Sequence, residues 1–95
     1  MSDAYDAFQE GRRRLRKGMT AQATVPLERA KRLEPDKASI REALGIAYFR
    51  LRRWSEAEAE FREVYQARRI VLGEEHPDTL AAREALDIVK ELQAG

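Results

Sequence analysis

Apolar residues recur along this chain at the three- and four-residue intervals of amphipathic helices. β-branched residues are too few and too scattered to form alternating strands. The pattern therefore predicts an all-α fold. We expect about five helices, over residues 4–17, 20–33, 37–52, 56–72 and 77–93.

Glycine and proline residues predict several of the helix ends. Gly18 follows the first helix and can take the left-handed conformation that often ends a helix. Pro77 suits the first turn of the fifth helix, where its missing N–H has no cost. Pro26 lies inside the second helix, so it should remove one backbone hydrogen bond and kink that helix.

Polar side chains predict the helix starts. Asp36 precedes the third helix and is a plausible N-cap. Ser55 and Glu58 have the spacing of a capping box at the start of the fourth helix. His76, the only histidine, is interpreted as a linker or cap residue of the fifth helix.

The chain contains an internal repeat. Gly11 and Gly45 are 45 − 11 = 34 positions apart. Small and large apolar residues follow in the same order in both copies, which indicates two copies of one helical hairpin. The same offset pairs Ala4 with Ala38, Arg16 with Arg50, Ala23 with Ala57, Leu27 with Phe61 and Ala30 with Val64.

The second copy carries Leu44-Gly45, then Tyr48, then Ala57 and Phe61. This order resembles the tetratricopeptide-repeat signature. The resemblance implies antiparallel helix pairs stacked in a short right-handed superhelix. It also implies a single domain over residues 1–95, with repeats at about 4–37 and 38–75.

The first copy departs from the signature in one place, and both copies depart from it in another. Arg14 stands where the second copy has its tyrosine. The tryptophan of the family pattern is replaced by Ala7 and Arg41. At Gly45 we expect a close approach of the neighbouring helix, with Ala57 as the small surface opposite. That approach would offset about 1 kcal/mol of lost helix propensity.

A longer spacing precedes the last helix. Leu86 lies 86 − 44 = 42 positions after Leu44, and the segment 72–80 resembles the linker of kinesin-light-chain-type repeats. Asp87 and Lys90 occupy the places of Gly45 and Tyr48. Their polarity predicts that helix 77–93 is a capping helix with one solvated face.

Composition limits the chemistry that the chain can perform. It has no cysteine, and 18 basic against 17 acidic residues give a formal charge of +1, so nucleic acid is a disfavoured partner. No apolar run is long enough to span a membrane, and the polar start is unlike a secretory signal, so we expect a cytoplasmic protein. No catalytic motif, metal site or cofactor site can be assembled, so we expect no enzyme.

Glutamates 56, 58, 60 and 63 are interpreted as a solvated helix face with ion pairs.

The family resemblance predicts where a partner would bind. In tetratricopeptide repeats, the first helix of each pair lines a concave groove that holds a protein or peptide. The asparagine that clamps carboxylates in some members is replaced here by Arg12 and Ile46. Arginines could still bind acidic groups of a partner. The expected lining is Tyr5, Phe8, Arg12, Leu15, Arg16, Glu42, Ile46, Phe49, Arg50, Glu84, Ile88 and Glu91, of which Phe8, Leu15 and Phe49 are also expected to contact the core.

Two alternative functions remain open. Leu80, Ile88 and Leu92 on the last helix are expected to be partly uncovered, which would favour a homodimer through the terminal helices. Residues Arg12 to Lys17 include five basic side chains that could contact nucleic acid, although they wrap around more than half of the helix.

Overall fold

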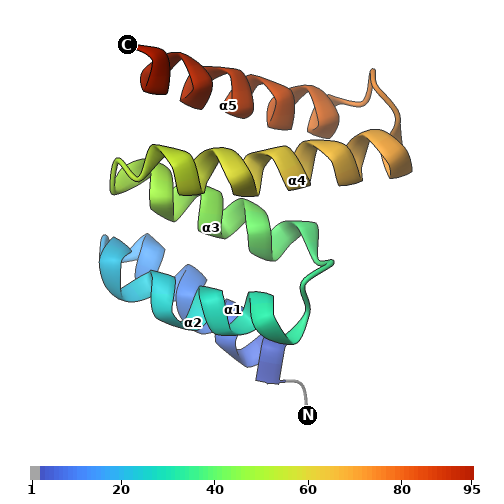
Figure 1. The fold of residues 1–95 in the computed structure, drawn as a ribbon. Helices are drawn as coiled ribbons and strands as arrows, with labels where there is room; N and C mark the ends of the chain where they lie inside the picture. Colours follow the sequence, from blue (N-terminus) through green and yellow to red (C-terminus); the bar gives the residue numbers. More distant parts are fainter. Residues whose placement is uncertain (1–2) are drawn as a thin grey trace.

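The computed structural model describes residues 3–95, and within them it contains five helices and no strand. They are α1 (Asp3–Arg16), α2 (Thr20–Leu33), α3 (Ala38–Arg50), α4 (Trp54–Leu72) and α5 (Pro77–Ala94). Each helix packs against the next one along the chain and runs in the opposite direction, so that α1 and α2 lie at one end of a stack and α5 at the other (Figure 1). The all-α prediction is confirmed. The right-handed superhelix stays a prediction.

The observed helix ends lie within two residues of the predicted ones. Gly18 has a φ of +78°, as expected of a residue that ends a helix in the left-handed region. Pro77 is in the first turn of α5, and the His76 side chain caps that helix by accepting a hydrogen bond from the Asp78 N–H at 3.0 Å. These three local predictions are confirmed because each depends only on neighbouring residues.

Two predicted N-caps are wrong. The N-cap position of α3 is Lys37 and not Asp36, and it makes no side-chain cap bond. The fourth helix begins at Trp54, which places Ser55 inside its first turn. Ser55 and Glu58 instead bind the side chain of Gln93 on α5, with 3.0 Å between Ser55 Oγ and Gln93 Oε1. A contact with a distant helix has replaced the local cap.

The two hairpin turns share one backbone feature. Arg52 lies 52 − 18 = 34 positions after Gly18 and has a φ of +60°. A non-glycine residue in this region suffers a steric cost of about 1–2 kcal/mol. The second turn therefore has the same positive φ as the first, but at an arginine where a glycine would adopt it without strain.

Each helical hairpin closes on a glycine. A Cβ atom on Gly11 would lie 2.4 Å from the Leu27 side chain, and one on Gly45 would lie 2.6 Å from the Phe61 ring. No Cβ atom fits at either distance, so both glycines are required by packing. The three atoms nearest to a Cβ on Gly45 all belong to the Phe61 ring. The place of Ala57 opposite Gly45 stays a prediction. In each hairpin a large side chain of the second helix fills the space that the glycine of the first helix leaves, so the two helices can pack closely.

One apolar cluster runs through the stack from α2 to α5. Leu44, Ala47 and Tyr48 of α3 lie at its centre, and Leu86 and Val89 attach α5 to it. Phe8, Leu15 and Phe49 are partly buried against the cluster, which confirms that they contact the core. The remaining buried members are Ala23, Leu27, Ala43, Ala57 and Phe61.

Pro26 explains why Arg14 replaces the signature tyrosine. Because Pro26 has no N–H, the carbonyl of Gln22, four residues earlier, lacks its usual helical donor. Arg14 on α1 donates from Nη1 to that carbonyl at 3.0 Å. The arginine thus satisfies an acceptor that the proline leaves unpaired. The kink in α2 stays a prediction.

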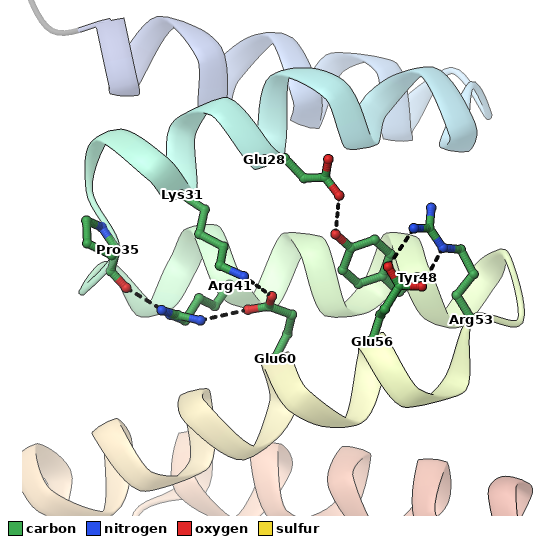
Figure 2. A network of polar contacts seen from close by, with 8 residues as sticks. All are labelled: Glu28, Lys31, Pro35, Arg41, Tyr48, Arg53, Glu56 and Glu60. Atoms are coloured by element: carbon green, nitrogen blue, oxygen red, sulfur yellow. Dashed lines mark hydrogen bonds and ion pairs between the residues drawn. The ribbon is translucent and has the colours of Figure 1, made fainter.

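A buried glutamate connects three helices (Figure 2). Glu60 of α4 is 3% exposed, and its two carboxylate oxygens pair with Lys31 Nζ of α2 at 2.5 Å and Arg41 Nη1 of α3 at 3.1 Å. Arg41 Nε also donates to the Pro35 carbonyl at 2.8 Å. The interpretation of Glu60 as part of a solvated face is therefore wrong. Its position shares a helix face with the buried Ala57 and Val64, and that face points into the stack.

The same interface contains a second set of polar contacts (Figure 2). Tyr48 donates its hydroxyl hydrogen to Glu28 of α2. Burial, followed by this bond to a carboxylate, raises the pKa of Tyr48. Arg53 lies 4.8 Å from the centre of the Tyr48 ring and binds Glu56 with both Nε and Nη2, which lowers the pKa of the Glu56 carboxyl. We call these two sets together the polar seam.

We expect Gly45→Ala to lower the free energy of unfolding by about 1 kcal/mol in urea titrations. Overpacking against Phe61 costs about 1–3 kcal/mol, and the gain in helix propensity offsets about 1 kcal/mol of it. Phe61→Leu removes the ring that the new methyl group would meet. The double variant should therefore lose less stability than the two single variants lose in sum. Strict additivity would contradict the close approach.

We expect Arg52→Gly to raise the free energy of unfolding by about 1 kcal/mol, because glycine adopts positive φ without steric cost. Lys17→Gly is the matched control, since Lys17 is exposed and its φ is not positive. That control should lower stability by about 0.5–1 kcal/mol. Equal shifts in the same direction would contradict strain at Arg52.

We expect Glu60→Gln to lower the free energy of unfolding by about 2 kcal/mol. The loss stays below that of a fully buried pair, because the Lys31 and Arg41 side chains are 34% and 20% exposed and keep some contact with water. Glu63→Gln on the exposed face of α4 is the control and should change stability by less than about 0.5 kcal/mol. An equally small effect at Glu60 would remove the seam as a stabilising contact.

Candidate functional site

One hollow on the surface lies between α1 and α3. It has a volume of about 430 Å³. Because consecutive helices alternate in direction, α1 and α3, which flank this hollow, run the same way (Figure 1). It is lined by Phe8, Arg12, Leu15 and Arg16 of α1 and by Ser39, Glu42, Ala43, Ile46 and Arg50 of α3.

Two further hollows adjoin this one. One, of about 300 Å³, reaches α5 and shares Ile46 and Arg50 with the first. The other, of about 390 Å³, lies toward the start of α1 and shares Phe8 and Arg12 with it. Because neighbouring hollows share lining residues, we treat the three as one surface and call it the groove.

The groove contains nearly all of the residues that the sequence singled out for partner binding. Glu84 is the exception among the main candidates, because it is exposed on α5 outside the three hollows. Glu91, a further lining residue from the sequence, is also exposed and outside them. That these residues bind a partner stays a prediction. The nine that line the groove are Tyr5, Phe8, Arg12, Arg16, Glu42, Ile46, Phe49, Arg50 and Ile88.

The α5 end of the groove is almost entirely apolar. Ile46, Phe49 and Ile88 line it together with Phe61, Ala85 and Arg50. Ile46 and Ile88 are 37% and 42% exposed. The Phe49 ring is held in place by an edge contact with Trp54, with 5.3 Å between ring centres. Sequence reasoning missed Trp54, which lies outside the repeat signature.

Three arginines give the α1 end of the groove a positive charge. No ion pair within the described residues involves Arg12, Arg16 or Arg50. Arg12 lies over the Phe8 ring at 5.4 Å, and Arg50 makes only a long contact of 3.4 Å to the Leu15 carbonyl. These guanidinium groups keep donors available for a ligand.

Glu42, the acidic residue that lines the hollow between α1 and α3, is already paired. Both carboxylate oxygens of Glu42 accept bonds from Arg68 of α4, at 3.1 and 3.2 Å. Arg68 was not predicted from the sequence, since only the packing of α4 on α3 brings it close. Because the charge of Glu42 is balanced by Arg68, it does not cancel the positive charge of the three arginines.

The polar seam is a weaker candidate for a functional site than the groove. Its carboxylates are bound to Lys31, Arg41, Tyr48 and Arg53, so the seam stabilises the stack. Between residues 3 and 95, no group of three or more His, Asp or Glu side chains could hold a metal ion. No helix in that range is both long and apolar enough to cross a membrane.

Comparison with known proteins identifies one part of the chain. The family model described as "Tetratricopeptide repeat" matches residues 38–78, which include all of α3 and α4 and the start of α5. No curated protein and no solved structure matches the chain. This repeat is a non-catalytic fold that generally mediates contacts between proteins. Residues 38–78 therefore form a tetratricopeptide repeat.

Proposed function

We propose that the groove binds a segment of a partner protein that carries an acidic group beside a large apolar side chain. The observation that supports this most directly is the arrangement of the two adjoining hollows. One is lined by Arg12, Arg16 and Arg50, and the next is lined almost wholly by apolar side chains. They share Ile46 and Arg50, so a single short segment can reach both.

The α1 end of the groove suits an anionic group. Guanidinium groups bind carboxylates through charge-assisted hydrogen bonds, which are about twice as strong as neutral ones. Arg12 is held over the Phe8 ring, which limits its rotamer freedom before binding. An acidic side chain or a free carboxyl terminus has the chemistry that fits here.

The α5 end of the groove suits an apolar anchor. A side chain that enters between Ile46 and Ile88 covers surface that is now exposed to water. Burial of a Leu or Phe side chain contributes about 1.5–3 kcal/mol. The anchor would thus supply affinity, and the arginines would select the charge and fix the position of the segment.

A scaffold or adaptor role in the cytoplasm belongs to the same proposal, because a groove without catalytic groups acts by holding a partner.

The chemistry of the groove favours a peptide over nucleic acid. Its apolar α5 end has no cation other than Arg50 to contact a phosphate chain. Competition with an oligonucleotide therefore belongs in the binding experiment.

The proposal is tested by fluorescence anisotropy with labelled peptides that combine two acidic residues with one Leu or Phe. We expect Arg12→Gln/Arg16→Gln to weaken binding by roughly tenfold or more, since two charge-assisted bonds are lost. Ile88→Ser should weaken it to a similar degree through the apolar hollow. Replacement of the peptide's acidic residues by amides should reproduce the arginine effect.

Arg29→Gln/Arg32→Gln is the matched control. It makes the same change in charge on exposed positions of α2 outside the groove. The control should bind within about twofold of the wild type, because surface charges act weakly at a distance in salt. Equal losses in the control and the groove variant would reject the groove as the site. Displacement of the peptide by an oligonucleotide alone would point to nucleic acid instead.

A further inference from the structure

The hollow between α1 and α3 carries more positive charge than the protein itself balances. Its lining contains Arg12, Arg16 and Arg50 against one carboxylate, Glu42, which sums to 3 − 1 = +2. None of the three arginines takes part in an ion pair within residues 3–95. Both oxygens of Glu42 are bound by Arg68, so that carboxylate does not pair with them either. The excess charge is therefore left for a ligand to balance.

The three arginines reach this hollow from two helices. Arg12 and Arg16 are one turn apart on α1 and so lie on the same face of it. Arg50 comes from α3, and its Nη1 atom lies 3.4 Å from the carbonyl of Leu15, the residue before Arg16. An anion in the hollow can thus be bound from both sides at once.

The hydrogen-bonding groups of the hollow are mostly donors. Each guanidinium group has five N–H donors and no acceptor, and Ser39 adds a hydroxyl to the lining. A carboxylate brings two oxygens and a single charge to such a site. A phosphate monoester brings three terminal oxygens and a charge of about −1.5 to −2 at pH 7. The charge and the acceptors of the phosphate therefore match this lining better than those of one carboxylate.

Two neighbouring carboxylates would bring the same charge at a higher entropic cost. Both side chains would have to be ordered on binding, whereas a phosphate places the whole charge on one side chain. The adjoining apolar hollow shares Ile46 and Arg50 with this one. A large apolar residue next to the phosphorylated residue can therefore enter that hollow at the same time.

We propose that the anionic group bound by the groove is a phosphorylated side chain of the partner segment, an inference that rests on the proposed function. The apolar anchor then contributes the same affinity whether or not the partner is phosphorylated. The phosphate adds the part that depends on modification, because only the phosphorylated segment balances the charge of Arg12, Arg16 and Arg50. Phosphorylation of the partner thus switches its binding on.

The proposal is tested by fluorescence anisotropy at about 0.15 M salt, where charges that are not in contact are largely screened. Three peptides differ at one position beside a Leu, which holds phosphoserine, Glu or Ser. We expect the phosphopeptide to bind roughly tenfold tighter than the Glu peptide, and the Ser peptide to bind most weakly. A Glu peptide that binds as tightly as the phosphopeptide would overturn this inference and leave the proposed function standing. If none of the three binds, the proposed function itself is rejected.

Arg50→Gln tests whether the third cation creates the preference for phosphate. It should weaken the phosphopeptide by about tenfold and the Glu peptide by less, so that the ratio of the two affinities falls. Arg32→Gln is the control, because it makes the same charge change at an exposed position outside the three hollows. It should leave the ratio unchanged within about twofold. An unchanged ratio in Arg50→Gln, or an equal fall in the control, would overturn the proposal.

Two competitors separate the possible sources of the phosphate. Inorganic phosphate lacks the apolar anchor, so it should displace the labelled phosphopeptide only at concentrations roughly tenfold or more above those of the unlabelled one. An oligonucleotide carries a single charge on each phosphate diester and should also compete weakly. If either competitor matches the unlabelled phosphopeptide at the same concentration of phosphate groups, the site does not select a phosphorylated segment and the proposal fails.

Discussion

The stack depends on a close approach of two helices that occurs twice. In each hairpin a glycine on the first helix leaves the space that a large side chain of the second helix fills, Leu27 against Gly11 and Phe61 against Gly45. Any Cβ atom on the glycine would separate the pair, and the apolar cluster that runs through α3 would then lose its packing. The groove depends on these contacts, because they hold α1 against α2 and α3 against α4.

The polar contacts differ between the two hairpins, although both hairpins have the same fold. In the second hairpin Tyr48 binds across to Glu28, and the buried Glu60 is bound by cations from two other helices. In the first hairpin Pro26 occupies the place of Glu60, since 60 − 26 = 34, and Arg14 occupies the place of Tyr48. The arginine then binds the carbonyl that the proline leaves free. One architecture is thus maintained by two different sets of hydrogen bonds.

The chain uses its charges in two ways. Inside the stack, carboxylates and cations are paired with each other and hold helices together. In the groove, by contrast, Arg12, Arg16 and Arg50 take part in no ion pair within the described residues. Unpaired exposed charge contributes little to stability but steers association. The proposed binding role of the groove follows from this division.

The sequence alone determined the helices and the repeat, because these depend on short spacings. Gly18 and Pro77 act on their own helix ends. The positions of Phe8, Arg12 and Ile46 in the groove were inferred from the resemblance to tetratricopeptide repeats, and the three side chains do line that hollow. Tertiary structure decided the rest. Ser55 exchanged a local cap for Gln93, and Glu60 turned out to be buried between two cations. Such contacts join residues far apart in the chain, and no local pattern encodes which helix will lie opposite.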